Sequence, residues 1–159
     1  TDALGNSYLV WYQTLKLTNN TDGDVPLKVK LVGKTDSKKT YRGTICPNAH
    51  KALEKKTGKK YKSATDLMKG KLGSKKSVDA VLFYGKMDNE WDALTIRITG
   101  LVDPIDKVDG KLFFEKKVLV LTYSRPGDEF ERHKDEVKFK GSKWEIDGKR
   151  KEIPQTPAK

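Results

Sequence analysis

Short runs of alternating apolar and polar residues, each closed by turn-forming residues, constrain the fold of this chain more than any other feature. The clearest run covers residues 94–99, where apolar side chains at every second position alternate with polar ones and Gly100 ends the run. A period of two with one apolar face is the pattern of a half-buried β-strand. About eight such runs follow one another at spacings of roughly 10–20 residues, so we predict a mainly β chain.

The predicted strands are apolar or alternating in composition and are bounded by residues that favour turns. They cover residues 8–17, 25–32, 40–45, 77–84, 94–99, 112–123, 136–140 and 143–147. Turns rather than helices join most of them, which favours antiparallel pairing. We expect one hairpin between the first two strands and another between the last two, through Gly141-Ser142. The pattern predicts one antiparallel β-sandwich domain over residues 1–149 and a disordered tail at residues 150–159.

One segment departs from this pattern and predicts helices. Pro47 suits the first position of a helix, and Gly58 suits its end. A second short helix is expected after Ser63 as its N-cap and before Gly70. We therefore predict a short helical insertion around residues 47–70, between strands of the sandwich.

The entire net charge of +11 lies in a segment that contains this insertion. Of the 33 Lys and Arg and 22 Asp and Glu in the chain, thirteen basic and two acidic residues fall between positions 38 and 76, which leaves twenty of each elsewhere. A surface of this kind attracts polyanions such as nucleic acid or anionic glycan, but it is also typical of a solvated face. Arg42 is the one arginine among the thirteen, whereas arginine is the side chain suited to bidentate phosphate recognition. This composition favours the solvated face and leaves the polyanion site as an alternative.

If the basic segment binds a polyanion, its cations would form the site together with two tyrosines that cations flank. The candidate residues are Lys38, Lys39, Tyr41, Arg42, Lys51, Lys55, Lys56, Lys59, Lys60, Tyr61 and Lys62. Proteins that bind single-stranded nucleic acid stack bases on exposed aromatic rings within a positive groove. Tyr41 and Tyr61 are the rings that could do so here, because the other aromatic residues lie mainly on apolar strands and are expected in the core.

Three stretches occur in an order known from other proteins: "TNNTDGDVPL" after the first strand, then "SVDAVLFY", then "WDALTIRITGL". In this order they resemble the immunoglobulin-like β-sandwich domains of unknown function on exported bacterial proteins and lipoproteins. The resemblance covers about residues 8–146, and the helical insertion departs from it. It implies an immunoglobulin-like form of the sandwich, an extracytoplasmic setting in the cell envelope or outside the cell, and a binding or scaffolding role. It supplies no catalytic residues.

The sequence holds no convergent catalytic set. Cys46 and His50 lie one helical turn apart and could form a nucleophile and base, but no oxyanion-hole motif accompanies them. We interpret them as a half-buried thiol and a surface imidazole. Acidic residues between positions 128 and 136, with His133, could offer oxygen ligands to calcium or magnesium, but their spacing matches no calcium loop and cations intersperse them. We expect no enzymatic activity, no metal site and no cofactor.

Two functions remain from these observations. The leading hypothesis is a non-catalytic accessory, binding or adhesion module of the cell envelope, whose partner is another envelope protein or polymer. The alternative is a polyanion-binding protein that acts through the Lys-rich insertion at residues 38–76. No run approaches the ~20 apolar residues that span a bilayer, so we expect no membrane span, and the sequence leaves the oligomeric state open.

Overall fold

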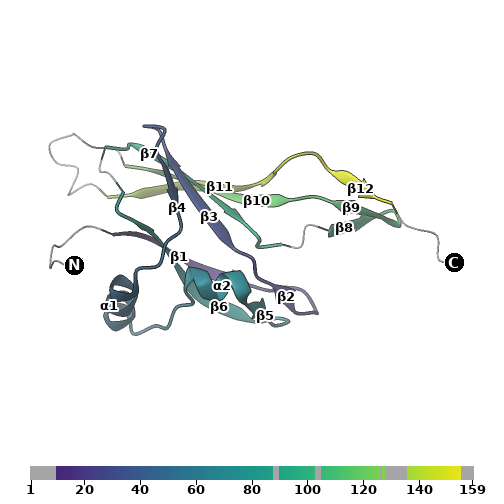
Figure 1. Ribbon diagram of the computed structural model, residues 1–159, viewed down its shortest axis with the longest axis horizontal. Coiled ribbons are helices and arrows are strands. Elements are labelled where there is room, and N and C mark those ends of the chain that lie inside the picture. Colours follow the sequence, from purple (N-terminus) through teal and green to yellow (C-terminus); the bar gives the residue numbers. More distant parts are fainter. Residues whose placement is uncertain (1–9, 88–89, 103–104, 126, 128–135, 155–159) are drawn as a thin grey trace.

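The computed structural model describes residues 10–87, 90–102, 105–125, 127 and 136–154 (Figure 1). Within these residues the chain forms antiparallel sheets and two short helices. This confirms the prediction of a mainly β chain with a short helical part. One core joins most of the sheets, and a smaller apolar cluster lies on its outer side.

The largest sheet has five strands in the order β11-β10-β7-β3-β4. The strands are β3 (Lys30–Thr35), β4 (Thr40–Arg42), β7 (Ala93–Thr99), β10 (Lys117–Ser124) and β11 (Lys138–Ile146). Every pairing between them is antiparallel. Strand β7 is the alternating run that the sequence marks most clearly, and it buries Ile96 and Ile98 while Arg97 lies on the opposite face.

A second layer packs against this sheet. Strand β1 (Trp11–Thr18) pairs with β6 (Ser77–Gly85), and the short β2 (Val25–Pro26) pairs with β5 (Lys71–Leu72). The main core lies between the two layers and contains Ile98 of β7, Leu82 of β6 and Leu121 of β10. The sheet faces that meet here are the apolar faces of the alternating strands, so their burial follows from the period-two pattern.

A third sheet has the order β12-β9-β8 and lies beyond one end of the five-stranded sheet (Figure 1). Its strands are β8 (Ile105–Val108), β9 (Lys111–Phe114) and β12 (Lys151–Ile153). Strand β9 leads into β10, and β11 leads into β12. At the junction of these two strand pairs, the N–H of Asp147 donates to the carbonyl oxygen of Lys116 at 2.7 Å. The paired strands therefore continue from the large sheet into the small one.

Both helices begin and end close to where the sequence places them. Helix α1 (Pro47–Thr57) has Pro47 in its first turn and ends at Gly58, whose φ of 68° is the left-handed conformation that glycine adopts without strain. Helix α2 (Ala64–Lys69) follows a capping box, in which Ser63 and Asp66 each accept the other's backbone N–H.

The helices pack on opposite faces of β6. Leu53 of α1 contacts a small cluster with Val81 and Phe83, whereas Leu67 of α2 lies in the main core. Leu72 of β5 is also a core residue. The basic segment is therefore built into the molecule, and it does not lie wholly outside the sheets.

Two pairings differ from the predicted hairpins. Residues 8–17 were expected to pair with 25–32, but β1 pairs with β6, and β3 pairs with β4 and β7. Gly141-Ser142 was expected as a turn between two strands, but both residues lie within the single strand β11. The register against β10 shifts between Thr122 and Tyr123, opposite Gly141. The glycine therefore marks an irregularity of the ladder, which a local sequence pattern does not distinguish from a turn.

The end of the chain also differs from the prediction. Residues 150–159 were expected to be a disordered tail, but Lys151–Ile153 form β12 and pair with β9. The long strand predicted at 112–123 is divided into β9 and β10. Strand β8 lies outside the predicted strands. It pairs with β9 across Asp109-Gly110, which is a typical two-residue hairpin turn.

Candidate functional site

The two tyrosines of the predicted polyanion site are not free aromatic platforms. Tyr41 is half-buried and packs against the main core, and Tyr61 is half-buried and packs against the cluster around Leu53 and Phe83. Burial of this kind orients each ring by packing. Each ring therefore has only part of its surface left for a base, and stacking on Tyr41 and Tyr61 stays a prediction.

The nine candidate cations are all exposed, and they fall into two groups. Lys38, Lys39 and Arg42 belong to the hairpin of β3 and β4, and the other six belong to α1 and the chain that follows it (Figure 1). Four of those six line a shallow, open depression of about 380 Å³: Lys51, Lys55, Lys59 and Lys60. The structure thus brings together only part of the predicted set.

The electrostatics of this depression are mixed. Glu54 lines it, accepts the backbone N–H of Tyr61 at 3.0 Å and binds the Lys60 ammonium at 3.2 Å. These contacts hold the pKa of Glu54 below its ordinary value. The depression also lies at the C-terminal end of α1, where the helix dipole is negative and favours lysines over a bound anion. Much of the positive charge of these lysines is therefore balanced by the Glu54 carboxylate and by the negative end of α1.

Cys46 and His50 do not form an activated pair. Burial raises the pKa of the Cys46 thiol, which is opposite to the shift that a nucleophilic cysteine needs. The His50 Nε2 lies 3.1 Å from the carbonyl oxygen of Tyr61 and 3.7 Å from a Glu54 oxygen. The imidazole therefore contacts the chain that follows α1, in agreement with a structural role.

Among the residues that the structure describes, no three or more His, Cys, Asp or Glu side chains are grouped so that they could hold a metal ion. The acidic candidates at positions 128–135, His133 among them, lie outside the described residues. Only Glu136 of that group is described, and it is exposed.

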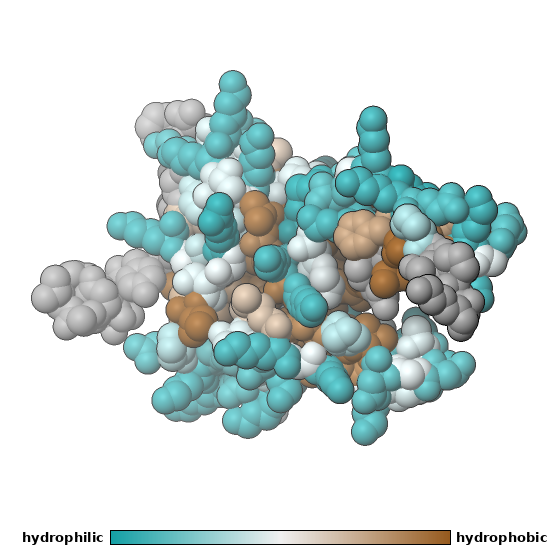
Figure 2. All heavy atoms as spheres, turned by 45° about the vertical axis from the view of Figure 1, so that its right-hand side comes forward, coloured by the Kyte–Doolittle hydropathy of each residue, from teal (hydrophilic) through white to brown (hydrophobic). Residues whose placement is uncertain are grey.

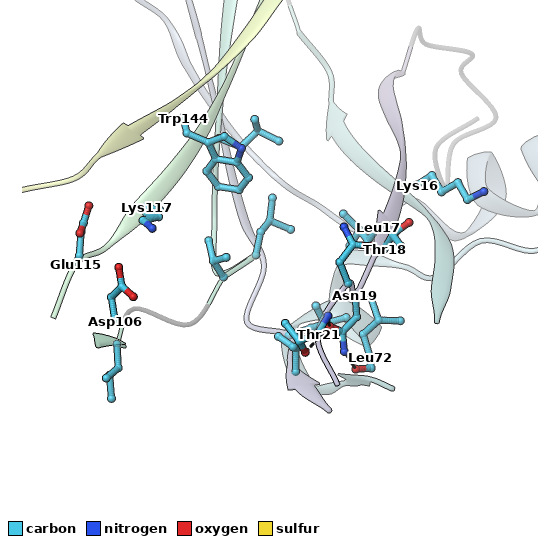
Figure 3. A pocket seen from close by; sticks show the side chains of 17 residues that line it. Lys16, Leu17, Thr18, Asn19, Thr21, Leu72, Asp106, Glu115, Lys117 and Trp144 are labelled. Atoms are coloured by element: carbon cyan, nitrogen blue, oxygen red, sulfur yellow. Dashed lines mark hydrogen bonds between the residues drawn. The ribbon is translucent and has the colours of Figure 1, made fainter. Parts of the chain in front are cut away.

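A feature that the sequence did not predict is an open cleft of about 580 Å³ between the two layers (Figure 3). Strands β1, β2 and β5 form one side, and β10, β11 and the chain around β8 form the other. Its apolar lining is Leu17, Val25, Leu27, Leu72, Leu101, Val102, Ile105, Leu119 and Trp144. Lys16, Asp106, Glu115 and Lys117 also line it. The volume lies within the range of known small-molecule sites.

The mouth of the cleft exposes large apolar side chains. Val102 is 43% exposed, Ile105 50% and Trp144 52%. Deeper in the cleft, Leu27 and Leu72 belong to the main core. On the face drawn in Figure 2, apolar side chains likewise reach the surface between hydrophilic ones. Large exposed apolar patches are a feature of interaction surfaces and ligand-binding grooves.

The buried Asn19 shapes one wall of this cleft. Its side-chain N–H groups donate to the carbonyl oxygens of Gly23 and Leu72 at 2.7 and 2.9 Å, and its oxygen accepts the N–H of Thr21 at 2.9 Å. These bonds use the amide completely and tie the turn after β1 to β5. Asn19 therefore fixes this wall of the cleft.

Comparisons with protein-family models, with curated proteins and with solved structures find no match for this chain. Neither helix in the described part of the chain is long and apolar enough to cross a membrane. The cleft and the basic surfaces are the features of this chain that bear on its function.

No local signal in the sequence identifies the cleft. Leu17, Leu101 and Trp144 lie on segments far apart in the chain, and nothing in the local sequence of any of them indicates a shared opening. Only the pairing of β1 with β6 and of β10 with β11 brings these residues to one opening. A prediction of the cleft thus requires the sheet order.

Proposed function

We propose that this chain is a non-catalytic binding module whose ligand contacts the open cleft between the two layers. The observation that carries the proposal is the exposure of Val102, Ile105 and Trp144 around a cavity of about 580 Å³. A folded chain loses roughly 25 cal/mol for each Å² of apolar surface left in water. A ligand that covers these side chains recovers that free energy.

The finer description of the module is part of the same proposal. Two antiparallel layers around one core are compatible with an immunoglobulin-like sandwich. The resemblance to domains of exported bacterial proteins supports an extracytoplasmic setting, with an envelope protein or polymer as partner. This setting is compatible with a role as an adhesion or accessory module, which needs no catalytic residues.

The cleft is tested with Nile red, an uncharged apolar dye that the basic surface does not attract by charge. Val102→Glu places a carboxylate at the cleft, and we expect it to weaken saturable dye binding by about tenfold. Val108→Glu is the matched control, because Val108 is also exposed but does not line the cleft. Binding that is absent in the wild type, or equally weakened in both variants, would contradict the proposal.

Polyanion binding is the second candidate, and the four lysines around the α1 depression favour it. Heparin binding is measured at low and at physiological salt, because binding at a polyanion site releases counterions and this release becomes less favourable as the salt concentration rises. Lys51, Lys55 and Lys59 are replaced by glutamine together, and the control replaces the equally exposed Lys28, Lys34 and Lys107. A loss confined to the first variant supports this function, and equal losses would show only a response to net charge.

A further inference from the structure

Strand β11 is an open edge of the large sheet. Within the described part of the chain it pairs with β10 alone, and β12 pairs with β9 alone. The bond between Asp147 and Lys116 continues the ladder between them. One side of this stretch therefore faces no described strand. A strand edge of this kind is a template for pairing with another chain.

Three large apolar side chains stand exposed on β11, all on one face. Phe139 lies opposite Tyr123 in the register, Trp144 opposite Leu119, and Ile146 opposite Lys117. Directly opposed residues share a face, and Leu119 and Tyr123 pack on the main core. The three side chains are 52 to 57% exposed. The second layer therefore leaves this face of β11 uncovered. A strand added at the edge would place every second side chain on the same face.

The charge of the edge is positive. Lys138, Lys140 and Lys143 lie on β11, and the strand has one acidic residue, Glu145. That carboxylate is bound by Arg97 at 2.7 Å and by Lys143 at 2.8 Å. Its charge is thus neutralised within the sheet, whereas Lys138 and Lys140 face solvent.

The acids that follow β11 are neutralised in the same way. Asp147 binds Lys116 at 2.6 Å, and Glu152 binds Lys111 at 3.2 Å. A second copy of this edge would bring lysines against lysines, and edge lysines are a common means of preventing such self-pairing. Charge complementarity therefore favours an acidic strand over a second copy.

We propose that the β11 edge binds an extended acidic segment of a partner protein as an added β-strand. Apolar residues at every second position of that segment cover Phe139, Trp144 and Ile146, and the acidic residues between them face the lysines. Main-chain hydrogen bonds give such a complex its affinity, and the alternating side chains give its specificity. The inference rests on the proposed binding role, because Trp144 also lines the cleft.

The probe is a synthetic peptide of alternating valine and glutamate, nine residues long like β11, titrated into the full chain. Two further peptides carry N-methyl groups at either the odd or the even positions. Only one edge of an added strand can pair with β11. We therefore expect one set of methyl groups to weaken binding by more than about tenfold and the other set to have little effect. Equal effects of the two sets would overturn strand addition.

The role of the β11 lysines is tested by reversing their charge. Lys138→Glu with Lys140→Glu is expected to weaken the valine–glutamate peptide by about tenfold and to favour a valine–lysine peptide. Lys34→Glu with Lys107→Glu is the control, since it changes net charge equally elsewhere. Equal losses in both variants would overturn the role of the β11 lysines. Self-association of the chain in sedimentation, with no peptide bound, would overturn the acidic partner in favour of a second copy.

The two proposals fail separately. If Val102→Glu abolishes Nile red binding while neither methylated peptide differs from the other, the cleft binds ligands and the strand addition is wrong. If the peptides show the odd–even difference but the dye does not bind, the edge is the docking surface and the cleft is not a ligand site.

Discussion

The two helices of the basic segment differ in how they meet β6. Helix α1 has eleven residues and buries Leu53 against a small cluster. Helix α2 has six residues, yet its Leu67 is 1% exposed and lies in the main core. The shorter helix is thus the more deeply integrated one. Net charge along the sequence says where lysines are, and it does not say which residues between them are buried.

Backbone hydrogen bonds show the same difference between the two helices. Leu27 and Val29 donate their N–H groups to the carbonyl oxygens of Gly70 and Leu67 at 2.9 and 3.4 Å. These bonds tie α2 to the chain between β2 and β3. Helix α1 is held through the chain that follows it, where Lys62 bridges to β6 beside Ala80. Loss of α2 would therefore open the core, whereas loss of α1 would expose one face of β6.

The largest expected effect comes from Leu67→Ala. The substitution leaves a cavity in the main core, and we expect a loss of about 3–5 kcal/mol in the free energy of unfolding. Urea denaturation followed by circular dichroism measures it. A loss below about 1 kcal/mol would show that α2 is not part of the core.

Leu53→Ala sharpens the comparison with α1. Leu53 is less completely enclosed than Leu67 and contacts a smaller cluster, so we expect a loss of about 2–3 kcal/mol by the same measurement. The two variants form a matched pair, since both remove the same atoms from a helix. A larger loss for Leu53 than for Leu67 would reverse the comparison.

The capping box of α2 contributes less. Ser63→Ala removes the acceptor for the Asp66 N–H and is expected to cost about 1 kcal/mol. Hydrogen bonds from Ser63 hold the pKa of Asp66 below its ordinary value. The stability that Asp66 contributes is therefore complete above a pH of about 4 and is lost as the pH falls below it. In Asp66→Asn this part of the acid dependence should disappear from a pH series of urea midpoints.

Tyr84 lies on the α2 side of β6, and its substitution is expected to change the free energy of unfolding in the opposite direction. Its hydroxyl is buried and has no hydrogen-bond partner within the described residues, so Tyr84→Phe is expected to raise the free energy of unfolding by about 1 kcal/mol. Burial raises the Tyr84 pKa, so the wild type should also lose stability as the pH rises above about 10. Tyr123→Phe is the control, because the Tyr123 hydroxyl donates to Gln13 at 2.7 Å and its removal should destabilise.

The smallest effect is expected on the surface of α1. Replacement of Lys51, Lys55 and Lys59 by glutamine should change the free energy of unfolding by less than about 0.5 kcal/mol, because the three side chains are exposed. A thermal melt at low salt measures it. A stabilisation well above this value would show that the lysines repel one another strongly enough to matter for folding.

Features with local causes were predictable from the sequence. The caps at Pro47, Gly58 and Ser63 act within one helical turn, and both helices form where these residues place them. Strand β7 shows its alternation because one face meets the core and the other meets solvent. In each case the residues that decide the structure are neighbours in the chain.

Features that depend on distant partners were not predictable in this way. Gly141-Ser142 has the composition of a turn, but pairing with β10 keeps it in strand β11. The strand at Lys151–Ile153 has little pattern of its own and is held by β9. The cleft and the exposed edge arise from the same long-range pairings. The sheet order, which the sequence does not show locally, therefore creates both surfaces.

The pairing of β1 with β6 has a consequence for biosynthesis. A ribosome makes the aromatic, apolar strand β1 before the two helices, and its strand partner β6 emerges only after them. Until then the apolar side chains of β1 have no partner strand and stay exposed. Contacts between residues so far apart in sequence also slow folding. A nascent chain stalled before Ser77 should consequently be the species that holdase chaperones capture most readily.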